Sequence, residues 1–285
     1  MYLRRIGVGH LLFALCFILI GAISLALHDF VLSQQPVPEG IPWREPLACI
    51  SAALMLLPGL GLLFPSTTRA SALTLTAFVA LWIIALWIPQ VLAHPGVEGN
   101  WLGVGEDLTL VVGGWLIYCG ASSAPALAAA PRADPGGSGA PVRMARILFG
   151  LALVPIGLSH FFYLKGAANL IPGWMPFHVP LTLLAGAGHI AAGLAIACGL
   201  VPRLAATTEA SMESLITLIV WVSAIGAKPA DHQNWVDLLI SSAETAAAWV
   251  VATSYGGRAR LEHVLEPELL NSDAKAAAGA GDPPR

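Results

Sequence analysis

Two stretches of the chain place acidic residues at helical spacing inside otherwise apolar sequence. Glu209, Glu213 and Thr217 recur every four residues, so they would lie on one face of a helix. A second stretch repeats the pattern with Asp237, Ser241 and Glu244. A charged side chain within a bilayer costs at least a few kcal/mol and usually faces a cavity or a partner. The two stretches therefore predict a polar site at membrane depth.

Two histidines fall in neighbouring apolar stretches. At a rise of about 1.5 Å per residue, His160, His189 and Glu244 would lie within roughly 8 Å of one another in depth, with Glu213 near the midplane. A histidine beside a glutamate can share a proton near neutral pH, so such a site could bind the carbonyls of a quinone headgroup or relay a proton. The candidate ligand-binding residues are therefore His160, His189, Glu213 and Glu244. The alternative is a hydrogen-bonded structural core.

Other chemistry is less well supported by the residues. The four cysteines are far apart and form no CxxC pair, so no metal site and no disulfide framework is expected. Ligation of a haem by His160 and His189 is disfavoured because their depths differ by about five residues. Glu209 lies close enough to one membrane face to snorkel, which favours a structural role for it. No catalytic residue is assigned.

The elements that position these residues must be membrane helices. The 285 residues are 56% hydrophobic and 11% charged, whereas a soluble domain is roughly a quarter charged. The mean hydropathy is +0.74. A helix needs about 20 apolar residues to cross a bilayer. We therefore predict an all-α membrane protein with eight transmembrane helices near 8–29, 45–65, 69–92, 105–123, 144–165, 179–201, 204–227 and 235–255.

The charged residues indicate orientation and partners. With the N-terminus inside, eleven of the fourteen basic residues fall in cytoplasmic segments and three in outer loops. This bias predicts cytoplasmic N- and C-termini. The net charge of -3 forms no basic patch, so membrane lipid is an expected partner and nucleic acid is not.

The chain also resembles itself at an offset of 134 residues. This offset aligns Pro46 with Pro180, Arg69 with Arg203, Trp87 with Trp221 and Trp115 with Trp249. We predict two parallel-repeat four-helix bundles, at 1–123 and 142–256. Residues 124–141 would form a cytoplasmic linker and residues 257–285 a mostly disordered cytoplasmic tail. The deep polar groups belong to the second half, because the counterparts of His189, Glu209, Glu213 and Glu244 are Met55, Leu75, Val79 and Leu110.

Several motifs of the second half resemble the DoxX-like family of bacterial four-helix membrane proteins. They are Ser159-His160-Phe161, the loop with Pro172, Trp174 and Pro176, the GAGHIAAG segment at 186–193, and Gly199-Leu-Val-Pro-Arg203. The resemblance implies a tandem fusion of two such units, located in the inner membrane of a bacterium. It also implies an association with quinone chemistry, as a small subunit beside a redox enzyme. Many relatives carry a glutamate four residues before the glycine that is Gly193 here, where this chain has His189.

Three functions follow from these observations. The first is a redox-associated accessory that binds a quinone or a lipid-like molecule in the second bundle. The second is a small-molecule or proton-linked transporter, and the third is a membrane scaffold without chemistry of its own. The sequence contains no P-loop, nucleophile elbow or HExxH motif, which disfavours a nucleotide-driven or hydrolytic enzyme. Whether the protein has another enzymatic activity is left open. For a ligand site, we expect His189→Met and Glu213→Val to abolish binding without lowering stability.

Overall fold

All regular structure in the described residues is helical. The structure is a computed structural model that describes residues 7–126 and 139–255. The predicted tail lies outside the described residues, as does most of the predicted linker. The first half contains α1 (Val8–Leu27), α2 (Arg44–Gly61), α3 (Thr68–Trp82), η1 (Ile83–Trp87), α4 (Ile88–Ala93) and α5 (Glu98–Ala126). The second contains α6 (Ala140–Phe162), α7 (Leu164–Leu170), α8 (His178–Cys198), α9 (Pro202–Ile216), η2 (Thr217–Trp221), α10 (Val222–Ala227) and α11 (His232–Ser254).

Seven helices within the described ranges are long and apolar enough to cross a membrane. They are α1, the continuous run Thr68–Ala93, α5, α6, α8, the continuous run Pro202–Ala227, and α11. The helix α2, predicted as a span at 45–65, is not among them. It has 18 residues and begins with the polar sequence Arg44-Glu45-Pro46, which leaves it a short apolar stretch.

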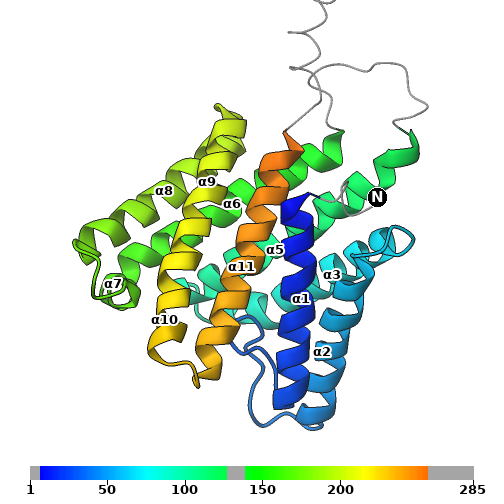
Figure 1. The fold of residues 1–285 in the computed structure, drawn as a ribbon, viewed down its shortest axis with the longest axis horizontal. Coiled ribbons are helices and arrows are strands. Elements are labelled where there is room, and N and C mark those ends of the chain that lie inside the picture. Colours follow the sequence, from blue (N-terminus) through cyan, green and yellow to red (C-terminus); the bar gives the residue numbers. More distant parts are fainter. Residues whose placement is uncertain (1–6, 127–138, 256–285) are drawn as a thin grey trace, which may run out of the picture.

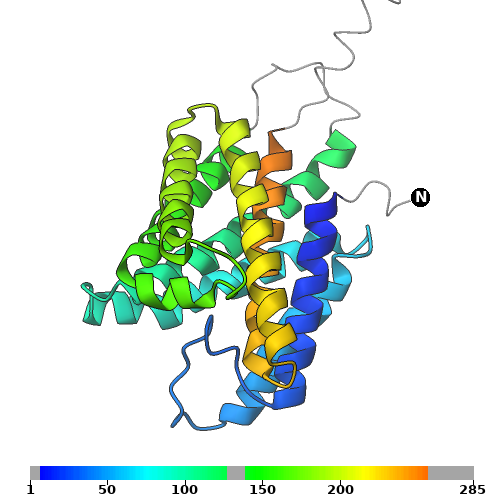
Figure 2. The same cartoon turned by 60° about the vertical axis from the view of Figure 1, so that its left-hand side comes forward.

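The two halves are joined through the last helix of each. The helix α11 lies in the middle of the assembly and packs against α1, α5 and α9 (Figures 1 and 2). In the same way α5 packs against α6 of the second half. The first helix of each half thus contacts the last helix of the other half. Within the halves, α1 packs on α2 and α3 on α5, while α6 packs on α8 and α8 on α9.

Corresponding positions of the halves adopt corresponding local structures. The π-helical segments Ile83–Trp87 and Thr217–Trp221 each interrupt an α-helix and stand 134 residues apart. The side-chain amide of Asn100 donates to Gln90 O at 3.2 Å, and that of Asn234 donates to Ala224 O at 3.3 Å. In the following residues, the indoles of Trp101 and Trp235 donate to the carbonyls of Pro95 and Pro229, both at 3.0 Å.

Glycines allow the closest helix contacts. A Cβ atom added to Gly193 of α8 would lie 2.5 Å from Gly150 O of α6, which is backbone that cannot move aside. Gly150 meets Gly193 O at the same distance. Gly59 of α2 would likewise meet Ala14 O and Ile18 N of α1. Small residues permit such approach where no hydrophobic driving force acts between helices in lipid.

We therefore expect Gly193→Ala to lower the stability of the protein. Overpacking of this kind costs about 1–3 kcal/mol, which should appear as a clearly lower melting temperature in mild detergent. Gly96→Ala is the matched control, because a Cβ there meets no atom within 4 Å. Equal melting temperatures for the two variants would show that α6 and α8 are not in tight contact.

Candidate functional site

A cavity of about 570 Å³ brings together all four candidate residues. His160 reaches it from α6, His189 from α8, Glu213 from α9 and Glu244 from α11. Residues of the connecting segments also line it, among them Gln34 of the first half. Most of the exposed surface of the wall is apolar, and polar side chains lie among the apolar ones. The predicted pocket lay between the four helices of the second half, and the structure adds Gln34, Leu102 and Glu106 from the first.

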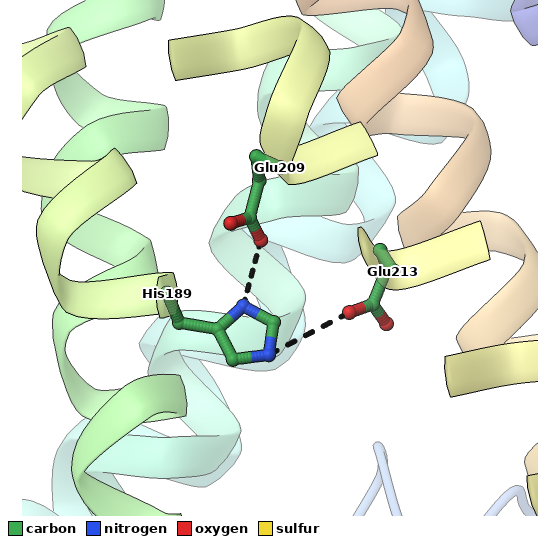
Figure 3. A group of neighbouring side chains, drawn as sticks. All are labelled: His189, Glu209 and Glu213. Carbon is green, nitrogen blue, oxygen red and sulfur yellow. Dashed lines mark hydrogen bonds and ion pairs between the residues drawn. The ribbon is translucent and has the colours of Figure 1, made fainter. Parts of the chain in front are cut away.

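The imidazole of His189 lies between two carboxyl groups. Its Nδ1 is 2.7 Å from Glu209 Oε1, and its Nε2 is 3.8 Å from Glu213 Oε2 (Figure 3). His189 is 2% exposed and Glu209 is 1% exposed. The shorter contact is a hydrogen bond, while the longer one exceeds hydrogen-bond distance. The expectation that Glu209 snorkels to a membrane face is therefore wrong, because its side chain points inward and binds His189.

His160 completes a pair of histidines on adjacent helices. Its Nδ1 lies 3.0 Å from Ile156 O, one turn earlier on α6. A carbonyl oxygen only accepts, so Nδ1 carries the proton and Nε2 is the nitrogen with a free lone pair. The rings of His160 and His189 have centroids 5.2 Å apart. The packing of α6 and α8 thus brings the two rings closer than the depth difference estimated from the sequence, about five residues or 7.5 Å, would suggest.

The carboxyl group of Glu213 also contacts a set of hydroxyl groups. Ser241 donates to Glu213 Oε1 at 3.5 Å, a long hydrogen bond. Thr217 lies 2.6 Å from the Ser241 hydroxyl and 3.1 Å from that of Thr245. Thr217 is the first residue of the π-helical segment η2, so the change of helix geometry occurs beside the cavity. These hydroxyls connect α9 and η2 to α11.

Two acidic residues of the first half lie deeper than predicted. Because the predicted fourth span starts near residue 105, Glu106 and Asp107 would stand at its outer edge. The helix α5 instead starts at Glu98, which places both residues more than two turns inside it. Glu106 lines the cavity and accepts a hydrogen bond from Gln34 Nε2 at 3.1 Å. Asp107 is 0% exposed and accepts from the indole of Trp87 at 2.9 Å. Acidic residues inside an apolar stretch were the available signal for Glu106, whereas nothing in the sequence singled out Gln34.

The cavity wall is acidic. It carries four carboxyl groups, from Glu106, Glu213, Asp237 and Glu244, and none of the described residues that line it is Lys or Arg. Glu244 Oε1 is buried without a hydrogen-bond partner among the described residues. Buried carboxyl groups need partners, because an unpaired charge in an apolar setting is costly. Such a wall suits a molecule that donates hydrogen bonds or carries positive charge.

Comparison with known proteins gives a match to a family model. Residues 142–222 match the family model DoxX. No curated protein and no solved structure matches the chain. The matched segment runs from α6 to the first residue of α10 and includes His160, His189, Glu209 and Glu213. The carboxyl group of Glu244 comes from α11, beyond the match.

Proposed function

We propose that this integral membrane protein of DoxX type binds a small lipophilic ring compound with hydroxyl groups, such as a quinol, in the cavity between its DoxX segment, residues 142–222, and the helices α5 and α11. The observation that carries the proposal is the convergence of His160, His189, Glu213 and Glu244 on one largely aliphatic cavity of about 570 Å³. Ligand pockets typically have about 300–1,000 Å³ and few convergent polar groups. In this role the protein would serve as an accessory to a membrane redox enzyme.

The polar groups of the wall favour the reduced form of such a carrier. Carboxylates and the unprotonated nitrogen of a neutral imidazole accept hydrogen bonds. A quinol has two hydroxyl donors, whereas a quinone has only carbonyl acceptors. A donor from the ligand would satisfy carboxyl oxygens such as Glu244 Oε1, which has no other partner within the described part of the chain. The aliphatic wall, including Leu215 and Ile219, would hold the ring and the start of its tail.

Titration calorimetry tests this proposal with the protein in nanodiscs. Decylubiquinol should bind with saturation at one site per chain, after subtraction of its partition into empty nanodiscs. Its bis-O-methyl ether, which lacks both hydroxyl donors, should bind about 10- to 100-fold more weakly, since one hydrogen bond to a charged group is worth about 1.5–3 kcal/mol. Identical, non-saturating uptake of the quinol and the ether would leave only nonspecific partition.

Transport is the second candidate function, and the same acidic wall favours it. Four carboxyl groups without a described Lys or Arg beside them could hold a cationic lipophilic substrate. Flux of such a cation, tetraphenylphosphonium, into proteoliposomes at a fixed membrane potential would distinguish transport from binding. An accessory protein should give no flux above that of empty liposomes.

We also propose that the chain crosses a bacterial inner membrane eight times as two parallel repeats, with both termini in the cytoplasm. The paired π-helical segments and paired Asn and Trp hydrogen bonds support the repeat. The exchange of contacts, α1 with α11 and α6 with α5, supports a two-fold relation between the halves. Reporter fusions at Arg132 and Glu98 should report opposite sides of the membrane, and the same side for both would refute this topology.

A further inference from the structure

We propose that His189 Nε2 and Glu213 bind a divalent first-row transition-metal ion, with Glu209 as the residue that orients His189. The ligand atoms of His189, Glu209 and Glu213 lie within 4.8 Å of one another. No cysteine takes part, so the absence of a Cys motif in the sequence does not bear on this site. The inference does not depend on the proposed quinol, because the ion would be held by protein side chains alone.

The two nitrogens of His189 have different partners, and this difference suggests their roles. Nδ1 lies 2.7 Å from Glu209 Oε1 and donates to it, which leaves the lone pair of Nε2 free. Metal-binding histidines almost always donate their other N–H to a carboxylate or a carbonyl, which fixes the tautomer and the ring orientation. His160 is arranged in the same way, with Nδ1 held by Ile156 O at 3.0 Å. Both imidazoles thus keep Nε2 available.

The separation of the free nitrogen from Glu213 fits two ligands of one ion. His189 Nε2 and Glu213 Oε2 are 3.8 Å apart, too far for a hydrogen bond. Nitrogen and oxygen ligands lie about 2.0–2.2 Å from zinc, so two ligands in tetrahedral positions stand about 3.3–3.5 Å apart. A side-chain shift of a few tenths of an ångström would bring both atoms to one ion.

A second observation independently points to a cation. A separate void of about 20 Å³ is lined by His189, Glu209, Glu213 and Glu244. A void needs only about 10–15 Å³ to hold a particle the size of a water molecule. Buried oxygens of two of these residues, Glu209 Oε2 and Glu244 Oε1, have no hydrogen-bond partner in the described ranges. Glu209 is 1% exposed, so water does not solvate it from outside.

The donor set and the charges indicate the class of ion. Imidazole together with carboxylates suits Zn²⁺, Fe²⁺ and Mn²⁺, and a divalent charge would offset the carboxylates around the void. Glu244 lines the same void, and His160 lies beside His189 with ring centroids 5.2 Å apart, so both could complete the coordination of the ion after side-chain movements. The same ion would face the larger cavity, which His189, Glu213 and Glu244 also line.

Metal analysis of the purified full chain tests the site. After chelator treatment and addition of Zn²⁺, Mn²⁺ or Co²⁺, we expect one tightly held ion per chain, measured by mass spectrometry of the metal content. Bound Co²⁺ should show the visible absorption of a low-coordinate site. His189→Met and Glu213→Val should lose the ion. The control variant His178→Met changes a histidine of the same helix that lies outside the cluster, and it should bind the ion like wild type.

Glu209→Gln separates orientation from ligation. The amide oxygen still accepts from Nδ1 but lacks the negative charge of the carboxylate. We therefore expect the ion to bind about 10- to 100-fold more weakly, which is the usual effect of changing the hydrogen-bond partner of a metal-binding histidine. If the variants at the ligand positions do not fold, the wild-type protein still tests the site. Its melting temperature should rise on adding Zn²⁺, and bound Co²⁺ should give the expected spectrum. Wild-type protein without stoichiometric metal, or unchanged metal content in folded His189→Met, would overturn the site. Decylubiquinol titrations of chelated protein show separately whether ligand binding survives.

Discussion

His189→Met should destabilise the protein by about 3–5 kcal/mol, because it leaves the Glu209 carboxyl group buried without its partner. The hydrogen bond is 2.7 Å long and both side chains are at most 2% exposed. Glu209→Leu should cost a similar amount by isolating His189. This changes the expectation from the sequence, in which His189→Met left stability unaffected. The free energy of unfolding can be measured by titration with SDS in mixed micelles.

The double variant His189→Met/Glu209→Leu is the matched control. It copies Met55 and Leu75 of the first half, which are 0% and 1% exposed and belong to the same apolar cluster. Replacing both members of a buried ion pair by apolar residues is often neutral or stabilising. We expect the free energy of unfolding of the double variant to be within about 1 kcal/mol of the wild-type value, or higher. If its loss equals the sum of the two single losses, the residues do not act as a pair.

Glu213→Val should weaken decylubiquinol binding about 10- to 100-fold, since a hydrogen bond to a charged group contributes about 1.5–3 kcal/mol. The side chain of Glu213 is 14% exposed and lines the cavity, so its loss costs less stability than the loss of His189. Valine is the residue at the corresponding place of the first half, where Val79 is 1% exposed. Calorimetry in nanodiscs gives the affinity.

Two further variants give this result its meaning. Ser211→Ala removes an exposed hydroxyl of the same helix that donates to Thr207 O. This variant should bind the quinol like wild type. Glu213→Gln keeps an acceptor oxygen and should fall between wild type and Glu213→Val. Equal affinity for wild type and Glu213→Val would place the quinol elsewhere. Repeating the titrations with chelated protein removes any contribution of a bound ion.

Much of the fold could be read from the sequence because membrane helices leave a strong signal. An apolar run of about 20 residues must satisfy its own backbone, so its position is set locally. The helices α1, α6, α8 and α11 accordingly lie close to the predicted ranges. The short α7 and the π-helical segments were not predicted, since they depend on loop packing and on a local change of hydrogen bonding. The packing of α1 on α11 could not be predicted either, because lipid-facing and helix-facing surfaces are equally apolar.

The sequence could predict which residues belong to the candidate site, but not which of them contact one another. Ionisable side chains in apolar sequence identified His160, His189, Glu213 and Glu244, and all four line one cavity. Depth along the membrane normal says nothing of lateral distance, so the contact of His189 with Glu209 was missed. For the same reason Glu209 was placed at the membrane face. Gln34 comes from an irregular segment whose path the sequence pattern does not define.

Photocrosslinking tests the central claim, that the cavity lined by His160, His189, Glu213 and Glu244 holds the ligand, most directly. A decylubiquinol analogue with a diazirine at the start of its tail would be irradiated with the protein in nanodiscs, and the labelled peptides identified by mass spectrometry. We predict label in 156–160 and 212–221, which line the cavity, and its loss when excess decylubiquinol competes. Label spread over exposed positions of α3, such as Leu73 and Leu81, and unaffected by competition would contradict the claim.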